Sequence, residues 1–512
     1  MITSSFSGAV YGVNAFMISI EVSIVNGTGL FMVGLPDSAI KESQHRIESV
    51  LKQIQYAMPR QRVIVNLAPA DIRKEGASYD LPIALSIIHA SEQCNLVYLS
   101  DYLIMGELAL DGILRPVKGV LPIAIEAHKN AFKGVIVPEK NGPEAGIVHK
   151  LEVIAVSHIT EAIAFLAAKR TIHPIQVDVR KLFETQVGTY EADFADVQGQ
   201  ENIKRALEIA AAGGHNVIMI GPPGAGKTML AKRLPSILPA FTLAETLETT
   251  KIYSVIGRMD NSCGLLPTRP FRAPHHTISD VALVGGGAFP HPGEISLAHH
   301  GVLFLDELPE FKRSVLEVMR QPLEDGKVVI ARAKFSVEFP ANFMLVASMN
   351  PCPCGYYNHP EKKCVCSMIS VQRYLNKVSG PLLDRIDLHV EVTPVVFEAL
   401  TSSKQNEASH LIRERVAKAR KIQEKRFQDH IELYTNARMS STMTKVFCPI
   451  SNTGQKLLQI AMEKLDLSAR AYERILKVAR TIADLAGNEN ISELHLAEAI
   501  QYRSLDRAGW GK

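Results

Sequence analysis

The sequence has little net charge and no long apolar run, and both absences limit what the protein can be. Its formal net charge over 512 residues is only +3, so a nucleic-acid-binding surface would have to be local. No apolar stretch reaches the roughly 20 residues needed to cross a bilayer. The first residues also lack the basic start and continuous apolar segment of a signal peptide. We therefore expect a cytoplasmic protein with no membrane partner.

Cysteine is also scarce, and its seven residues are unevenly spread. An odd number of cysteines in a large intracellular chain argues against a disulfide framework. Four of them form two close pairs: Cys352, Cys354, Cys364 and Cys366. Two such pairs can supply four thiolates to a tetrahedral Zn²⁺, but four reduced thiols in a surface loop explain the pattern equally well. His359 is either a substitute ligand or an ordinary loop residue. The remaining cysteines are expected to be structural: Cys94, Cys263 and Cys448.

One segment carries a specific chemical signal, because residues 221–228 match the phosphate-loop pattern G-x-x-x-x-G-K-[ST]. The apolar run before it predicts a buried strand over 217–220, and the residues from Met229 predict a helix. In this context Lys227 brings charge to the β- and γ-phosphates of a nucleotide, and Thr228 offers a hydroxyl to Mg²⁺. The predicted nucleotide-binding residues are Gly221, Pro222, Pro223, Gly224, Ala225, Gly226, Lys227 and Thr228.

Two further predicted strands end in polar residues that could complete a nucleotide-hydrolysis site beside the phosphate loop. Residues 301–305 predict a strand that ends in Asp306 and Glu307. In such enzymes the Asp holds Mg²⁺, and the adjacent Glu orients and deprotonates the attacking water. A third strand, over 343–347, leads to Asn350. This amide would bond the γ-phosphate or the water, unless it simply starts the turn that follows.

The chain divides into four predicted parts. Residues 1–170 alternate strands and helices and predict an α+β domain, and residues 171–190 form a polar linker. The nucleotide module covers 191–395, and residues 396–512 are mainly helical. Strands are expected at 63–69, 102–110 and 134–139, and helices at 38–54, 81–93, 119–132, 412–427 and 493–503.

Several further segments are specific enough to carry a family resemblance. They are FRAPHHT at 271–277, GGG at 285–287, PGEISLAH at 292–299 and GVLFLDELPEF at 301–311. Over essentially its whole length the chain resembles the ComM/YifB family of magnesium-chelatase-like AAA+ ATPases. The resemblance implies an α/β fold with a P-loop AAA+ core, an N-terminal α+β Lon-protease-like (ribosomal S5-like) domain and a C-terminal helical lid.

The same resemblance implies roles for individual residues. It places Gln198 at the adenine side, Asn350 as the first sensor and Arg470 as the second, with Arg474 in reserve. Arg385 resembles the arginine finger, which would reach the γ-phosphate held by a neighbouring subunit. A site completed in this way implies an ATP-dependent oligomer, and the family pattern implies a homohexamer.

The N-terminal domain raises the question of peptidase activity. Ser78 lies where the Lon pattern has its nucleophile, but that pattern's lysine positions fall on Leu121 and Ile123. Lys118 lies earlier in the alignment. A Ser–Lys dyad needs a lysine amine to accept the serine proton, so we expect the fold without the chemistry and a structural Ser78.

The resemblance implies a DNA helicase or translocase that promotes branch migration during natural transformation, acting on single-stranded or branched DNA with recombination proteins as further partners. Four residues of a Pro-rich insertion are candidate DNA contacts: Arg269, Arg272, His275 and His276. The two histidines fit a buried turn equally well. The basic segment 412–427 is better explained as a solvated lid helix. A protein-remodelling ATPase and a chelatase-like motor subunit remain alternatives.

Overall fold

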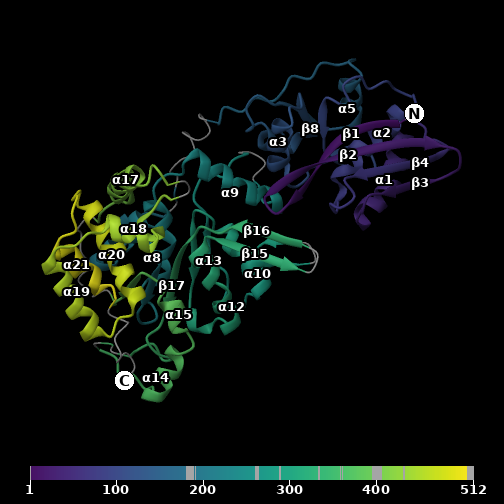
Figure 1. Ribbon diagram of the computed structural model, residues 1–512. Helices are drawn as coiled ribbons and strands as arrows, with labels where there is room; N and C mark the ends of the chain where they lie inside the picture. The colour runs from purple at the N-terminus through teal and green to yellow at the C-terminus, as the bar shows by residue number, and fades with distance from the viewer. Residues whose placement is uncertain are drawn as a thin grey trace. The chain divides into compact units, whose positions relative to one another are not determined.

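The computed structural model describes residues 2–179, 190, 192–259, 264–287, 290–332, 335–357, 359, 361–394, 406–430 and 433–503. The described residues form two compact units (Figure 1). The first unit draws on Met1–Gln186, Thr242–Pro267 and Ala333–Glu338, and the second on Val187–Phe241, Thr268–Arg332 and Phe339–Lys512. Cys263 and residues 180–189, half of the predicted linker, lie outside the described residues.

A seven-stranded sheet with the strand order β3-β4-β2-β1-β5-β8-β9 forms the first unit. Its strands are β1 (Ile2–Tyr11), β2 (Asn14–Val25), β3 (Leu30–Val33), β4 (Arg62–Ala68), β5 (Tyr102–Ile104), β8 (Gly134–Pro138) and β9 (Glu152–Val156). β1 and β2 form a long antiparallel hairpin that the sequence did not reveal. Two short strands pair separately, β6 (Glu107–Leu108) and β7 (Leu114–Arg115).

Helices pack on both faces of this sheet because alternate residues of a strand point to opposite sides. Ile18 and Ile20 of β2 belong to one core with α1, α2 and α5, whereas Ala15 joins α3 in another. The helices of this unit are α1 (Ser38–Gln53), α2 (Asp80–Ala90), α3 (Val120–Lys129), α4 (Gly142–Ala145), α5 (Ile159–Leu166) and α9 (Leu243–Ile256). The predicted helices of this region and the strands at 63–69 and 134–139 are confirmed, whereas the strand predicted at 102–110 is divided into β5 and β6, which belong to different sheets.

The second unit is built on a five-stranded parallel sheet with the order β11-β14-β17-β10-β18. Its strands are β10 (Val217–Ile220), β11 (Phe271–Arg272), β14 (Val302–Leu305), β17 (Met344–Met349) and β18 (Leu388–Glu391). The remaining strands are β12 (Gly285–Gly286), β13 (His291–Pro292), β15 (Lys327–Arg332) and β16 (Phe335–Pro340). The three strands predicted around the phosphate loop are all present.

Helices surround this sheet and continue into a C-terminal helical region. Those of the core are α7 (Glu201–Gly213), α8 (Lys227–Arg233), α10 (Asp280–Val284), α11 (Glu294–Leu297), α12 (Arg313–Val318), α13 (Arg320–Asp325), α14 (Met368–Leu375) and α15 (Gly380–Leu383). The later ones are α17 (Ser409–Arg426), α18 (Ser441–Phe447), α19 (Asn452–Leu465), α20 (Ala469–Leu485) and α21 (Glu493–Gln501). Apolar residues of α7, α17 and α20 share one core with the sheet, so the helical region is packed onto the nucleotide module.

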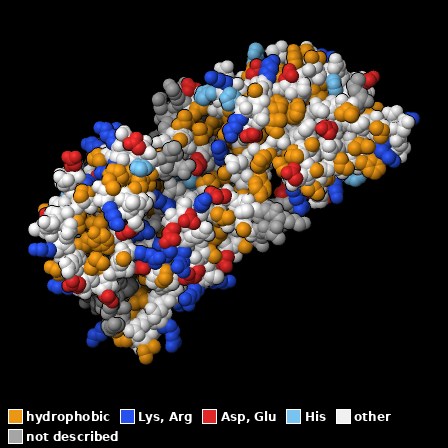
Figure 2. All heavy atoms as spheres, in the orientation of Figure 1, with side chains coloured by type: hydrophobic (Ala, Val, Ile, Leu, Met, Phe, Trp, Pro, Cys, Tyr) orange, Lys and Arg blue, Asp and Glu red, His pale blue; other side chains and the backbone are white. Residues whose placement is uncertain are grey.

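The structure agrees with the low net charge and the lack of long apolar runs in the sequence. On the face drawn in Figure 2, basic and acidic side chains are intermixed over both units. No helix among the described residues is long and apolar enough to cross a membrane.

A buried carboxylate fastens the C-terminal helical region together. Asp484 of α20 accepts hydrogen bonds from Arg426 of α17 at 2.5 Å, from Arg480 at 3.0 Å and from Asn436 at 2.8 Å. Its side chain is fully buried. Two guanidinium groups therefore depend on one carboxylate for their charge compensation.

Asp484→Ala is expected to lower the free energy of unfolding of the second unit by about 3–5 kcal/mol, because it leaves buried arginines without a counter-charge. Chemical denaturation, followed by the far-ultraviolet circular dichroism of the helices, measures this change in free energy. Glu489→Ala removes an exposed acid from the next turn and should shift the free energy by less than about 0.5 kcal/mol. Equal midpoints for the two variants would contradict this role of Asp484.

Candidate nucleotide-binding site

The phosphate loop, residues 221–228, lies between β10 and the start of α8. Gly224 and Gly226 have φ of +78° and +85°, a left-handed conformation that other residues rarely adopt. Gly221 is limited by space instead, since a Cβ there would lie 2.2 Å from the carbonyl oxygen of Val392. The conformation of the loop thus requires the glycines of the pattern.

Lys227 begins α8, and its side chain lies against the phosphate loop. Its Nζ donates to the carbonyl oxygens of Gly221 and Pro222 at 2.7 and 2.9 Å, and to Oδ1 of Asn350 at 3.1 Å. Burial lowers the pKa of Lys227, while the two carboxylates that follow β14 oppose this shift. The predicted first sensor and the predicted phosphate-binding lysine are therefore in direct contact.

The acidic strand end meets the same loop. Thr228 donates a hydrogen bond from Oγ1 to Oδ2 of Asp306 at 2.7 Å. Ser348 of β17 donates to the other oxygen of that carboxylate, a contact that sequence reasoning missed. A buried serine in an otherwise apolar strand was the available signal. The residues Thr228 and Asp306 thus present the hydroxyl and carboxylate oxygens that Mg²⁺ prefers.

Glu307, the next residue, has a left-handed backbone with φ of +55°. Its Oε2 lies 3.7 Å from Nδ1 of His276, and the ring of His275 lies 4.1 Å from that of His276. Glu307 is 57% exposed and His276 is 33% exposed. Contrary to the suggestion from the sequence, the turn is therefore not buried: His276 faces the predicted catalytic base, and His275 is exposed while its Nδ1 accepts a hydrogen bond from the backbone of Thr277 in that turn.

The two arginines of the same insertion are engaged within the second unit. Arg272 forms a two-bond ion pair with Glu294, at 2.6 and 2.8 Å. Arg269 donates to the carbonyl oxygens of Pro239 and His300, each at 2.7 Å. Both side chains stabilise the loop, which leaves the histidines as the more accessible of the four predicted DNA contacts.

The predicted adenine-side residue Gln198 lies shortly before α7 and is half-buried. Its neighbour Gln200 contacts the phosphate loop directly, because its Nε2 donates to the carbonyl oxygen of Ala225 at 2.9 Å. Gln200 has φ of +59°, an uncommon conformation for a residue with a side chain. Gln200 belongs to the segment 197–200 that the resemblance assigns to the adenine side, within which Gln198 is the residue predicted to bind nucleotide.

Arg385, the predicted finger, is buried within its own subunit. Its guanidinium forms an ion pair with Glu324 at 2.5 Å and donates to the carbonyl oxygen of Pro381 at 2.5 Å. Its side chain is 6% exposed, whereas that of Glu324 is 47% exposed. The residue lies just before β18, at the amino edge of the parallel sheet.

The second-sensor helix meets the same edge. Arg474 of α20 donates to Oδ1 of Asp387 at 2.7 Å, and Oδ2 of Asp387 accepts from the backbone of Asn216, just before β10. Arg470 is exposed, one turn earlier on α20. Since β10 has 4 residues at about 3.3 Å each, about 13 Å separates this edge from the phosphate loop.

The four predicted metal ligands come together. The sulfur atoms of Cys352, Cys354, Cys364 and Cys366 all lie within 4.8 Å of one another. His359 is turned to the loop backbone, because its Nδ1 accepts from the amides of Glu361 and Lys362. It thus behaves as an ordinary loop residue.

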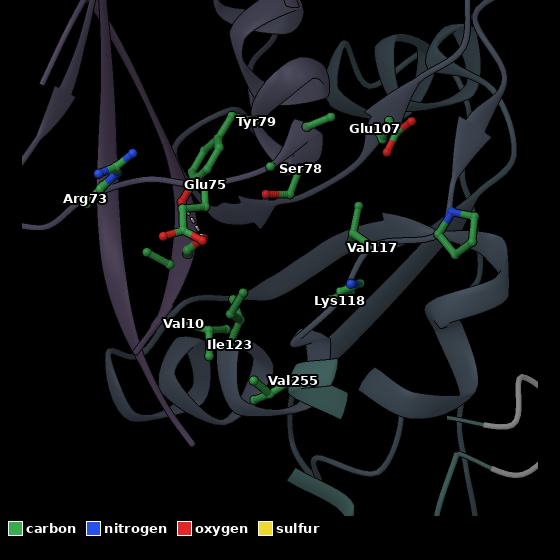
Figure 3. Close-up of a pocket in the computed structure, with 15 residues that line it drawn as sticks. Val10, Arg73, Glu75, Ser78, Tyr79, Glu107, Val117, Lys118, Ile123 and Val255 are labelled. Carbon is green, nitrogen blue, oxygen red and sulfur yellow. Dashed lines mark hydrogen bonds between the residues drawn. The ribbon is translucent and has the colours of Figure 1, made fainter. Parts of the chain in front are cut away.

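The first unit holds a pocket of about 320 Å³ lined by Ser78, Lys118 and Glu75 (Figure 3). Desolvation raises the pKa of Glu75 to about 7. Leu121 and Ile123, which occupy the lysine positions of the Lon pattern, are buried apolar residues. Lys118 shares the pocket with Ser78 despite its earlier place in the sequence, but in the described part of this unit no hydrogen bond joins them. The non-proteolytic reading stays a prediction.

Comparison with known families matches three regions of the chain. Residues 193–400 match "Magnesium chelatase, subunit ChlI", residues 20–141 match "Subunit ChlI of Mg-chelatase", and residues 406–503 match "Magnesium chelatase, subunit ChlI C-terminal". Together these matches cover most of both structural units.

Individual relatives extend the similarity to the full length. Competence protein ComM of Haemophilus influenzae is 44% identical over 507 residues, which cover 98% of this chain and 97% of that protein. The uncharacterized protein YifB of Escherichia coli is 43% identical over 505 residues, with 98% and 96% covered. Lon protease 2 of Bacillus subtilis is 29% identical over 185 residues, or 31% of this chain and 33% of its own length.

The fold agrees with these similarities. A parallel sheet carries the phosphate loop of a AAA+ core, a helical lid follows it, and the N-terminal α+β unit is Lon-protease-like. The chain belongs to the ComM/YifB family of magnesium-chelatase-like AAA+ ATPases.

Proposed function

We propose that this protein is an ATP-dependent DNA motor of the ComM type, a ring helicase or translocase that promotes branch migration in recombination during natural transformation. The observation that carries the proposal is the division of the catalytic groups between the two edges of one parallel sheet. One edge presents the phosphate loop and the acids, and the other presents the arginines. This division supports a site completed by a second subunit in a head-to-tail arrangement, which forms a ring where the rotation between subunits closes.

ATP hydrolysis can be assigned to residues at the carboxyl edge. Thr228 and Asp306 would hold Mg²⁺, which supplies positive charge to the β- and γ-phosphates. Lys227 would exchange its loop carbonyl partners for phosphate oxygens, and Asn350, already 3.1 Å from Lys227, would follow it to the γ-phosphate. Glu307 would accept the proton of the attacking water.

Arg385 would act across the subunit boundary. Its guanidinium is compensated by Glu324, which is exposed enough to be replaced by another anion. Exchanging a carboxylate for the γ-phosphate of a neighbouring subunit keeps the buried charge paired. We propose a homohexamer on this basis, with Arg470 and Arg474 contributing from the same edge.

His276 would connect DNA to hydrolysis. It lies in the insertion that carries the exposed His275, and it contacts the carboxylate of Glu307. Binding of DNA phosphates or bases by the two imidazoles would draw His276 away and leave Glu307 to act on water.

The name of the Haemophilus relative, a competence protein, supports DNA rather than a protein client as the substrate. We propose a cytoplasmic protein that acts on single-stranded or branched DNA, with recombination proteins as further partners. The proposed cofactors are Mg²⁺ with ATP, and a structural Zn²⁺ at Cys352, Cys354, Cys364 and Cys366.

ATPase rates with different polymers test the substrate class. Single-stranded or branched DNA is expected to raise the rate several-fold, because a motor couples turnover to its track, whereas an unfolded protein should leave it unchanged. Glu307→Gln, which lacks the base, measures contaminating activity. Stimulation by unfolded protein and by neither DNA would instead indicate a protein-remodelling ATPase.

Mixing two inactive variants tests the shared site. Arg385→Ala lacks the finger and Glu307→Gln lacks the base, so neither should turn over ATP alone. In a 1:1 mixed ring, a site is complete when Arg385→Ala supplies the phosphate loop with Glu307, and the neighbouring Glu307→Gln subunit supplies Arg385. Each of the two neighbours is of the required type in half of the cases, so about one quarter of the sites should work. Both variants must still bind a fluorescent ATP analogue. A mixture as inactive as its components would show that Arg385 does not act in trans.

His276→Ala tests the coupling. The exposed contact between His276 and Glu307, at 3.7 Å, is worth at most about 1 kcal/mol, so releasing Glu307 should raise the basal kcat up to about fivefold. The KM for ATP should not change, and stimulation by DNA should be lost. His275→Ala, the neighbouring control, should keep the basal rate and weaken DNA binding. A basal rate that falls in His276→Ala would mean that His276 supports the chemistry rather than restraining it.

A further inference from the structure

The four-cysteine loop has the dimensions of a metal site. The sulfur of Cys352 lies 3.3 Å from that of Cys354 and 3.7 Å from that of Cys364, and the sulfurs of Cys354 and Cys364 are 3.6 Å apart. Tetrahedral Zn²⁺ with bonds of about 2.3 Å places its ligand sulfurs about 3.8 Å apart. These distances are far too long for a disulfide, and all four cysteines are free thiols.

The loop is attached to the nucleotide site at its start. Asn350, which accepts a hydrogen bond from Lys227, precedes Cys352 by only one intervening residue. Cys352 is fully buried, so it fixes the chain close to the end of β17. Any displacement of Cys352 would therefore move the Asn350 amide relative to Lys227.

A second attachment reaches the phosphate loop itself. Gly355, inside the cysteine loop, has φ of +84°, and a Cβ at this position would lie 2.5 Å from Cδ of Pro223. The backbone of the cysteine loop is therefore packed directly on the phosphate loop, at a point where only glycine fits.

A third attachment lies beyond the last cysteine. Ser367 follows Cys366 and caps α14 by accepting a hydrogen bond from the amide of Ser370. Val371 and Tyr374 of that helix are buried. The last cysteine is therefore followed directly by a helix that is packed into the second unit.

We propose that the four thiolates bind one Zn²⁺ that holds this loop against the phosphate loop and Asn350, so that nucleotide affinity depends on the bound metal. The proposal rests on the assignment of the phosphate loop as the ATP site. Four ligands from one loop would replace the packing that an exposed loop of this size lacks. Loss of the metal releases Gly355 from Pro223 and Asn350 from Lys227 while leaving the parallel sheet intact.

The test begins with the full-length protein purified without chelator. It should contain about one zinc per chain, whereas Cys364→Ser/Cys366→Ser should contain none and should bind a fluorescent ATP analogue about tenfold more weakly. Cys448→Ser, which changes a buried thiol outside the cluster, should retain both properties. Wild-type protein without stoichiometric zinc would overturn the metal site.

Two glycine variants distinguish the effect of the bound zinc from the effect of the contact between Gly355 and Pro223. Gly355→Ala should keep its zinc but lose nucleotide affinity, because the new methyl group displaces Pro223. Gly487 has a similar φ of +71°, but a Cβ at this position would meet no atom within 4 Å. Gly487→Ala should therefore retain both its zinc and its nucleotide affinity. Full nucleotide affinity in Gly355→Ala, or in the zinc-free double variant, would overturn the coupling.

If the double variant fails to fold, zinc can be released from the wild type with an organomercurial thiol reagent and restored after its removal. Nucleotide affinity should fall and recover with zinc content, and an affinity that stays constant through this cycle would contradict the proposal. Zinc-loaded wild type that binds no nucleotide would refute the ATP-site assignment, while its zinc stoichiometry would still decide the metal site.

Discussion

The carboxyl ends of β10, β14 and β17 lie side by side because the three strands run parallel and in register. Val346 of β17 is opposite Val217 of β10 on one side and Phe304 of β14 on the other. This register brings the carboxylate that follows β14 to the hydroxyl that begins α8, and the amide that follows β17 to the adjacent lysine. A slip of one residue would move a strand end by about 3.3 Å and reverse its side chains, so every contact of the site depends on this alignment.

The same register also fixes the positions of the residues at the amino edge of the sheet. Asp387 is buried beside β10, and although burial alone would raise its pKa, Arg474, His215 and the backbone of Asn216 hold the pKa well below its usual range. Asp387 is therefore charged at neutral pH and contributes stability above its unfolded pKa, which is lost as the pH falls through the folded value. A permanently charged anchor fixes α20 to the edge that carries Arg385, so the groups proposed to act on a neighbouring subunit are positioned together.

The sequence predicted the site residues that directly follow an apolar strand. It did not predict the residues that only the folded chain brings to the nucleotide site. The phosphate loop, Asp306 and Asn350 each follow an apolar strand, so local periodicity placed them at one edge. Ser348 and the contact of His276 with Glu307 depend on the pairing of separate strands, which periodicity does not specify. The burial of Arg385 against Glu324 was hidden for the same reason, because its partner is distant in sequence.

The first unit is joined to the nucleotide module by more than its own C-terminal end. The chain leaves the second unit after Phe241, forms α9 within the first unit and returns at Thr268. There Ser254 of α9 donates a hydrogen bond to buried Glu144, and its carbonyl oxygen accepts one from Gly119. Removing the first unit would expose this buried face of a helix that lies, in sequence, between the phosphate loop and Asp306. The Lon-like unit therefore packs a helix of the chain that also builds the nucleotide module, a structural role that does not depend on lysines at the positions of Leu121 and Ile123.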